Sequence, residues 1–246
     1  MTSRQGSEYD RLFYPFLFEG GQARVEDVLA QVRHSTLEKC REVIELRRTI
    51  LARFQDEIVA AGQAMAKAFT SGATLFAFGN GGSATDAQDL VADLLDPPFA
   101  PWKSLPAVAI TNDIAVVTAV ANDVGFDNIY TRQIIAFGKP GDIAFGFSTS
   151  GNSKNVLVAF EQSKKQGMLT VGLAGYDGGK MAHAEYAEAA DYCIVAPSDH
   201  IPRIQEGQAT VYHALLEVVQ AELSKRSLIG NSDRLKNHPL QTGAVS

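Results

Sequence analysis

From residue 74 onward, apolar and polar residues are arranged in two alternating patterns. Short, almost wholly apolar runs have the length of buried strands, and the segments between them repeat apolar residues every three or four positions, as amphipathic helices do. This succession predicts an α/β fold, a doubly wound, five-stranded parallel sheet covered by helices on both faces. The predicted strands are residues 74–78, 107–110, 142–147, 169–173 and 192–195. The predicted helices are residues 85–95, 114–120, 129–136, 153–166, 179–189 and 203–226.

The segment that precedes the sheet is helical as well. Residues 25–71 carry apolar positions at helical spacing and predict two or three amphipathic helices, which cover a sheet face or take part in an oligomer contact. Residues 1–25 are predicted as an N-terminal extension, whose aromatic cluster packs in a groove of the fold or in a subunit contact. The main domain with its helical arm is predicted to span residues 26–228, and residues 229–246 are predicted as a flexible tail.

Charge and composition narrow the class of protein. The formal net charge of −6 gives no global electrostatic reason to bind nucleic acid or an acidic membrane surface. No apolar run approaches the roughly 18 residues of a membrane span, and the N-terminus has no apolar signal core. The two cysteines, Cys40 and Cys193, show no C-x-x-C spacing, so neither a disulfide framework nor a cysteine zinc site is indicated. We therefore expect a soluble cytoplasmic protein.

A glycine turn after the first predicted strand carries the clearest chemical signal. Residues 79–83 read Gly-Asn-Gly-Gly-Ser and lead into the predicted helix 85–95. The glycines let the backbone approach a ligand closely, while Asn80 and Ser83 add hydrogen-bonding side chains. The free N–H groups and the positive dipole end of the following helix attract an anion. A phosphate group is the expected occupant.

A second turn of the same kind follows the third predicted strand. Residues 148–153 read Ser-Thr-Ser-Gly-Asn-Ser and place four hydroxyls at another predicted helix N-terminus. Such residues are also common helix caps, so a single turn would be weak evidence. Two such turns at carboxyl ends of strands, where open α/β sheets bind their ligands, favour a phosphorylated ligand.

A dinucleotide-binding enzyme is a rival interpretation. Gly79, Gly81 and Ala84 satisfy the G-x-G-x-x-G/A fingerprint after a predicted strand. The acidic residue that would hold the ribose is expected about 20 positions further on, whereas Asp113 lies roughly 30 positions on. The fingerprint also leaves the Ser/Thr turn unexplained, and no Walker-type motif occurs. We therefore expect no nucleotide cofactor.

Five short blocks stand in a fixed order along the chain: residues 79–83, 121–123, 148–153, 175–179 and 203–206. Their order and spacing resemble the sugar isomerase (SIS) domain family, in particular its phosphoheptose isomerase branch. The resemblance covers about residues 40–225. It implies a flavodoxin-like sheet, a homotetramer, a phosphorylated sugar as ligand, and interconversion of sedoheptulose 7-phosphate with its aldose isomer. It also implies one divalent metal, usually zinc.

The resemblance implies substrate contacts at Asn80, Gly81, Gly82, Ser83, Asn122, Asp123, Ser148, Thr149, Ser150, Ser153 and Gln205. It implies metal ligands at Asp89, Asp93, Gln205 and His213, three oxygens and one imidazole that suit a harder ion than a His-rich set does. It implies Asp93 as general base and His213 as general acid in an isomerisation that passes through an enediolate. Taken alone, His213 reads more readily as a core or interface histidine; beside Gln205 in this framework, the functional interpretation is favoured.

The chain departs from the family pattern at four positions. The family's first-helix His and Glu are Asp89 and Asp93 here, an Arg is Pro97, and an Asp is Pro202. Asp89 and Asp93 are one helical turn apart, so both carboxylates can point into the site. Asp is one methylene shorter than Glu, and a misplacement of about 1 Å can cost on the order of a hundredfold in rate. The alternative is therefore a non-catalytic SIS protein that binds a phosphosugar or a protein partner.

Overall fold

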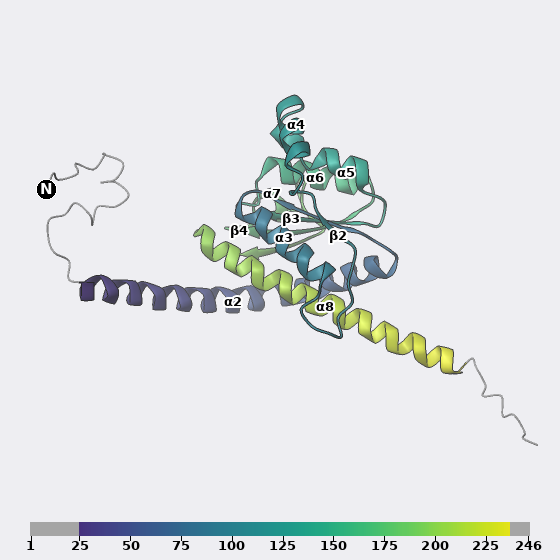
Figure 1. Cartoon of the computed structure of the whole chain (residues 1–246), viewed down its shortest axis with the longest axis horizontal. Coiled ribbons are helices and arrows are strands. Elements are labelled where there is room, and N and C mark those ends of the chain that lie inside the picture. Colours follow the sequence, from purple (N-terminus) through teal and green to yellow (C-terminus); the bar gives the residue numbers. More distant parts are fainter. Residues whose placement is uncertain (1–24, 237–246) are drawn as a thin grey trace, which may run out of the picture. The chain divides into compact units, whose positions relative to one another are not determined.

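The fold is built on a sheet of five parallel strands. The computed structural model describes residues 25–236, with side chains for residues 27–225. The strands are β1 Leu75–Gly79, β2 Ala107–Ala109, β3 Ile143–Ser148, β4 Leu169–Gly175 and β5 Tyr192–Ala196. They lie in the order β2-β1-β3-β4-β5, and each neighbouring pair is parallel (Figure 1). This is the flavodoxin-like order, which confirms the predicted α/β fold and its five-stranded sheet.

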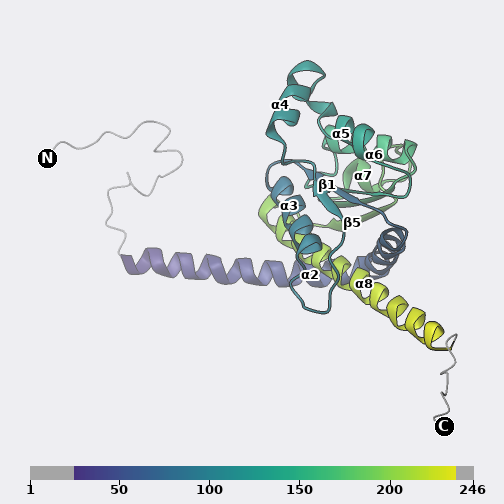
Figure 2. The ribbon, with the colours of Figure 1, turned by 45° about the vertical axis from the view of Figure 1, so that its right-hand side comes forward.

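Helices cover both faces of the sheet, as the turned view in Figure 2 also shows. They are α2 Val25–Thr70, α3 Gly82–Leu95, α4 Ile114–Asp123, η2 Phe126–Asn128 (a 3-10 helix), α5 Thr131–Phe137, α6 Lys154–Lys165, α7 Gly179–Ala182 and α8 Ile201–Lys236. The C-terminal part of α2 packs on one face together with α3 and α8. The other face is covered by α5, α6 and α7.

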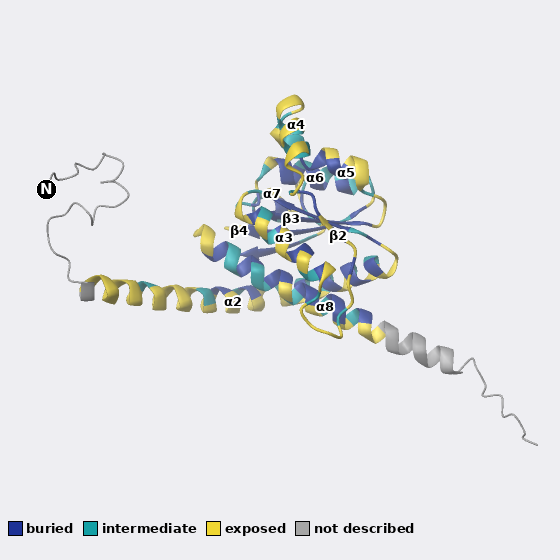
Figure 3. Cartoon of the chain, in the orientation of Figure 1, coloured by how far each residue is buried: buried dark blue, intermediate teal, exposed yellow. Residues whose placement is uncertain are grey.

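Strand side chains alternate between these two cores. In β1, Leu75 and Ala77 face the core under α3 and α8, whereas Phe76 and Phe78 face the core under α5 and α6. Every residue of β1 and β3 is buried, and Figure 3 shows the interior strands in the buried colour. A strand that is buried on both faces must be apolar throughout, which is why these strands appear as continuous apolar runs in the sequence.

The prediction of two or three helices before the sheet is wrong, because residues 25–70 form the single helix α2. This segment contains no proline, and Gly62 is its one glycine, so no residue forces a break. Thr36 belongs to a residue type that often caps a helix. Its hydroxyl instead donates to the carbonyl of Val32 at 2.8 Å, within the helix.

Two other helices have different ends from those predicted. The predicted helix 179–189 is the four-residue α7, which ends at Ala182. The chain then turns back, so that the N–H of Ala190 donates to the carbonyl of Met181 at 2.9 Å. Helix α8 continues to Lys236, past the predicted start of the tail at residue 229. Residues 1–24 of the predicted extension and residues 237–246 of the predicted tail lie outside the described residues.

The chain divides into two compact units, Met1–Glu42 and Val43–Ser246. The described part of the first unit is the beginning of α2, which exposes the apolar side chains of Val28, Leu29 and Val32. The second unit contains the whole sheet and the remaining helices. None of the helices between residues 25 and 236 combines the length and the hydrophobicity that a bilayer-spanning segment needs.

Candidate functional site

The crevice between β1 and β3 is the point where the chain reverses its direction of travel across the sheet. Open α/β sheets bind their ligands at such a point. Asn80 follows β1 and Asn155 lies in the first turn of α6, and their side-chain amides exchange two hydrogen bonds of 2.9 and 2.8 Å. Tyr130 donates its hydroxyl to the carbonyl of Gly79, and the same hydroxyl lies 3.1 Å from Oδ1 of Asn80. These bonds tie the glycine turn to the helix that follows the Ser/Thr turn.

Hydroxyls converge in the turn after β3. Ser148 donates to Oγ of Ser153 at 2.9 Å, and the hydroxyls of Ser148 and Ser150 lie 3.5 Å apart. Gly151 has a φ of +64°, and a Cβ there would lie 1.9 Å from the carbonyl oxygen of Gly178, so only glycine fits. Ser153 is the N-cap of α6 and its side chain makes no capping bond, which leaves its hydroxyl within the turn. The turn combines hydroxyls with a helix N-terminus, the chemistry that binds a phosphate.

Helix α8 brings Gln205 to the glycine turn. A Cβ on Gly82 would lie 1.9 Å from Nε2 of Gln205, so the Gln205 amide occupies the space that a side chain at position 82 would fill. Gly81 has a φ of +57°, a conformation that glycine adopts without strain. Gly81 and Gly82 are both exposed. The turn therefore offers open backbone next to an amide side chain.

One face of α3 carries three carboxylates, those of Asp86, Asp89 and Asp93, and α8 packs against this helix. The hydroxyl of Tyr212 donates to Oδ2 of Asp89 at 2.5 Å. Nε2 of His213 lies 3.4 Å from Oδ2 of Asp93 and 3.9 Å from Oδ2 of Asp89. The structure thus places the side chain of the predicted base, Asp93, next to that of the predicted acid, His213.

Burial and the charges of neighbouring carboxylates shift the pKa values of several groups in this cluster. Burial raises the pKa of Asp93 and the charge of Asp89 raises it further, while His213 opposes both effects. Burial, followed by the charge of Asp89, raises the pKa of Asp86 to about 6. Burial, the hydrogen bond to Asp89 and the nearby carboxylates raise the pKa of Tyr212, so this hydroxyl keeps its proton and acts as a donor. A carboxylate with a raised pKa is a better proton acceptor near neutral pH, which suits a general base.

The metal ligands that the resemblance implies do not form a metal site as they are placed. Among residues 27–225, no group of three or more His, Cys, Asp or Glu side chains is arranged to hold a metal ion. Oδ2 of Asp89, the oxygen nearest to His213, already accepts the Tyr212 hydroxyl. Gln205 lies against Gly82 in the glycine turn. Asp89 is thus hydrogen-bonded to Tyr212, and Asp93 lies beside His213.

Four of the predicted substrate-binding residues are placed away from these contacts. Asn122 and Asp123 end α4, are exposed, and share a hydrogen bond of 2.7 Å. Ser83 is buried in the first turn of α3, and Thr149 is half-buried beside Gly175. The roles of these four residues, like those of all the other predicted site residues, remain predictions.

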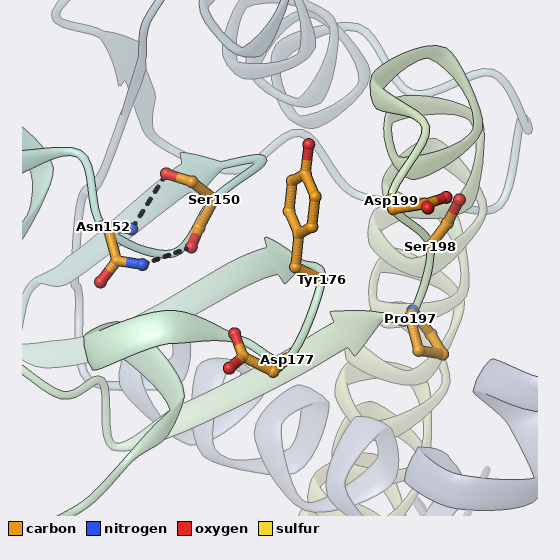
Figure 4. Close-up of a pocket in the computed structure, with 7 residues that line it drawn as sticks. All are labelled: Ser150, Asn152, Tyr176, Asp177, Pro197, Ser198 and Asp199. Atoms are coloured by element: carbon orange, nitrogen blue, oxygen red, sulfur yellow. Dashed lines mark hydrogen bonds between the residues drawn. The ribbon is translucent and has the colours of Figure 1, made fainter.

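An open pocket of about 760 Å³ lies beside the Ser/Thr turn, at the carboxyl ends of β4 and β5. Ser150 and Asn152 border it, and the exposed ring of Tyr176 points into it (Figure 4). Ser150 holds this border in shape, because its hydroxyl accepts the Asn152 N–H at 3.1 Å and its carbonyl accepts the Asn152 amide at 3.0 Å. The pocket leaves the turn accessible to a ligand from solvent.

Residues 40–175 match the family model of the SIS domain. The chain belongs to the SIS domain family. A phosphoheptose isomerase from Geotalea daltonii is 44% identical over 167 residues, which cover 68% of this chain and 84% of that protein. Another, from Geobacter sulfurreducens, is 38% identical over 200 residues, which cover 81% of this chain and 98% of that protein. These relatives confirm the resemblance to the phosphoheptose isomerase branch.

Solved structures of SIS proteins in this branch agree with the fold. A phosphoheptose isomerase from Neisseria gonorrhoeae aligns with a TM-score of 0.70 at 31% identity, covering 77% of this chain and 99% of that one. One from Francisella tularensis aligns with a TM-score of 0.71 at 29% identity, covering 77% of this chain and 98% of that one.

The dinucleotide interpretation depends on Asp113 as the acidic residue that would hold a ribose. In the structure this carboxylate instead caps α4 by accepting the Val116 N–H at 3.0 Å.

Four residues of this SIS site were not predicted: Asp86, Tyr130, Asn155 and Tyr212. Asp86 lies three positions before Asp89 on the same helix face, and Tyr212 lies seven positions after Gln205, so the helical period could have identified both. Tyr130 and Asn155 act through contacts with Gly79 and Asn80, across 51 and 75 residues of sequence. No local pattern carries that information.

Proposed function

We propose that this protein is a phosphosugar isomerase that interconverts sedoheptulose 7-phosphate and its aldose isomer. One observation carries the proposal: a carboxylate and an imidazole, Asp93 and His213, lie 3.4 Å apart on facing helices of an SIS domain. Two relatives named phosphoheptose isomerase, which are 44% and 38% identical to this chain, support the proposal.

The isomerisation moves a proton between C1 and C2 of the sugar. Asp93 takes the proton from one carbon, and the electron pair left behind forms the enediolate. His213 supplies a proton to the carbonyl oxygen as it gains negative charge, which stabilises the intermediate. Asp93 then returns its proton to the neighbouring carbon, and the hydroxyl that becomes the new carbonyl gives its proton back to His213. The raised pKa of Asp93 matches its role, because a base with a pKa nearer to neutrality accepts a carbon-bound proton more readily.

The remaining predicted residues would hold the substrate. The turn of residues 148–153 takes the phosphate through its hydroxyls and the N-terminus of α6. Asn80, Gly81, Gly82 and Gln205 contact the sugar between the phosphate and the reacting carbons. Asn122 and Asp123 would also contact the sugar, a role that the family resemblance implies. The same resemblance supports a homotetramer, which light scattering of the full chain would test.

Nuclear magnetic resonance of sedoheptulose 7-phosphate incubated with the protein tests the proposal. Turnover should appear for the wild type and fall about 10²–10⁴-fold in Asp93→Asn and His213→Ala, the range that proton-transfer groups contribute. Asp96→Asn removes an exposed carboxylate at the C-terminal end of α3 and His34→Ala removes an exposed imidazole on α2; both should keep full turnover.

A wild type that binds the sugar phosphate by calorimetry but turns over no ketose phosphate would refute the isomerase. That result would instead identify a non-catalytic SIS protein that binds a phosphosugar.

A further inference from the structure

A second pocket, of about 350 Å³, opens directly beside the reacting pair. Its lining includes Asp93, Phe99, Trp102, His213 and Leu216. The volume is at the lower end of the range for small-molecule sites. Three titratable groups, those of Asp93, His213 and Glu217, therefore share one concave space with two aromatic rings, the combination of polar and apolar walls that small-ligand sites show.

Both aromatic rings come from the irregular segment between α3 and β2. Phe99 and Trp102 meet edge to face, with ring centroids 4.9 Å apart and planes at 64°. Trp102 also packs against the core under α3 and α8, whereas Phe99 is 56% exposed. The exposed ring of Phe99 lies on the pocket wall, where a ligand can reach it.

The segment is anchored at the point where it leaves the pocket. Gln220 of α8 is 3% exposed, and its side-chain amide makes two hydrogen bonds with the backbone of Lys103. Lys103 N–H donates to Oε1 of Gln220 at 2.9 Å, and Nε2 of Gln220 donates to the carbonyl of Lys103 at 2.8 Å. The N–H of Trp102 donates to the carbonyl of Phe99 at 2.9 Å, which closes the turn between them. The backbone that follows Trp102 is thus held by the same helix that carries His213.

A wall of this kind would favour an enediolate intermediate. Negative charge on the sugar oxygens is stabilised more strongly by Asp93's partner His213 when water is kept away, because the electrostatic interaction is less screened. Aromatic rings supply a large apolar surface that can lie along the C–H groups of a sugar. A wall of Phe99 and Trp102 would do both at the place where proton transfer is proposed.

We propose that Phe99 and Trp102 form the wall of the subsite that receives the carbonyl end of the sugar phosphate, and that they determine which sugar is accepted. This inference rests on the proposed function, in which Asp93 and His213 are the reacting pair. Neither ring transfers a proton; each positions the sugar and excludes water.

Fluorescence provides a direct test, because Trp102 is the one tryptophan of the chain. Titration of the full-length protein with sedoheptulose 7-phosphate should change the intensity or wavelength of its emission in a saturable manner. Inorganic phosphate, which fits the turn of residues 148–153 alone, should leave the emission unchanged. Saturable binding of the sugar phosphate in calorimetry without any change in emission would overturn the inference while leaving the proposed function standing.

Kinetics of variants test the same wall independently. Phe99→Ala removes an exposed ring and should raise KM for the sugar phosphate about tenfold, with a smaller change in kcat. Trp102→Leu should do the same, and Trp102→Phe should restore most of the affinity. Phe137→Ala, which removes an equally exposed ring on α5, is the matched control and should leave both constants unchanged.

The outcomes separate the two proposals. A KM within twofold of the wild type in Phe99→Ala and Trp102→Leu would refute the wall. An emission change and binding without turnover would refute the isomerase but keep the subsite. The absence of both binding and turnover of the sugar phosphate would refute both.

Discussion

Tyr212 on α8 donates its hydroxyl to Asp89 on α3 at 2.5 Å, and this bond joins the two helices that carry the proposed reacting pair. The ring of Tyr212 is held in turn by an edge-to-face contact with Phe147 of β3, at 5.9 Å between centroids. In the family pattern, position 89 is a histidine that binds metal. Here the carboxylate has a protein partner instead, and the site is organised by a hydrogen bond.

The first prediction concerns competition between this bond and a metal ion. Tyr212→Phe keeps the packed ring but frees Oδ2 of Asp89, so the affinity of the protein for zinc should rise about tenfold, which corresponds to about 1.4 kcal/mol. Calorimetric zinc titration measures it. Tyr192→Phe removes a half-buried hydroxyl from β5 and serves as the control. Equal zinc affinity in Tyr212→Phe and the wild type would show that the hydroxyl does not compete with the ion.

The second prediction concerns the pH dependence of turnover. A general base must be ionised to act, so kcat/KM should fall as the pH drops through the pKa of Asp93. The charge of Asp89 helps to raise that pKa. Asp89→Asn removes the charge, so the acid limb of the profile should move to lower pH by a fraction of a pH unit. Asp96→Asn should leave the limb in place. A limb that stays or moves to higher pH in Asp89→Asn would contradict the assignment of Asp93 as the base.

Much of the fold could be predicted because short stretches of consecutive residues determine it. β1 and β3 are buried on both faces and therefore read as uninterrupted apolar runs. The glycine turn and the Ser/Thr turn were recognisable for the same reason, since each is a short run of residues at a strand end. Helical spacing showed that residues 25–70 are helical, but the number of helices depends on whether residues that often cap helices interrupt the chain. Thr36 is such a residue, and its hydroxyl bonds within the helix instead.

The parts of the site that could not be predicted are contacts between distant segments. Tyr212 and Asp89 are 123 residues apart, and Gln220 and Lys103 are 117 residues apart. Whether an aspartate on α3 faces a metal, a substrate or a tyrosine depends on how α8 packs against it. Sequence spacing placed Asp89 and Asp93 on one face but gave no information about the opposite helix.

The third prediction concerns Asp86, whose Oδ2 is buried and has no hydrogen-bond partner among the described residues. Its pKa of about 6 lies above that of a free aspartate, so between about pH 4 and 6 the folded protein binds more protons than the unfolded chain. The free energy of unfolding therefore falls as the pH rises through this window. Asp86→Asn removes the ionisation and should be more stable than the wild type at pH 7.5 by about 1 kcal/mol, a value kept small because partial solvent exposure screens the charge.

Urea unfolding at pH 4.5 and pH 7.5 measures this difference. The gain in Asp86→Asn should shrink at the lower pH, where the wild-type carboxyl is largely protonated in the folded state and no longer carries a buried charge. Asp123→Asn changes an exposed carboxylate and should show no gain at either pH. A stability difference that is equal at the two pH values would exclude the ionisation of Asp86 as its cause.

The fourth prediction concerns the shape of the proposed phosphate-binding turn. In Gly151→Ala the new Cβ would lie 1.9 Å from the carbonyl oxygen of Gly178, a backbone atom that cannot move aside, so the turn itself must shift. The hydroxyls of Ser150 and Ser153 shift with it, and a displacement of about 1 Å should lower kcat/KM for the sugar phosphate on the order of a hundredfold. Steady-state kinetics and calorimetric affinity for inorganic phosphate should both report the loss.

Gly141→Ala is the control that separates the effect of backbone strain from the effect of displacing the turn of residues 148–153. Gly141 also has a positive φ, +90°, but a Cβ there would have no atom within 4 Å, and the residue precedes β3 rather than following it. Both variants therefore carry the cost of an alanine in a left-handed conformation, roughly 1–3 kcal/mol of stability. Only Gly151→Ala should also lose phosphate affinity. Equal phosphate affinity in the two variants would mean that the turn of residues 148–153 is not where the phosphate binds.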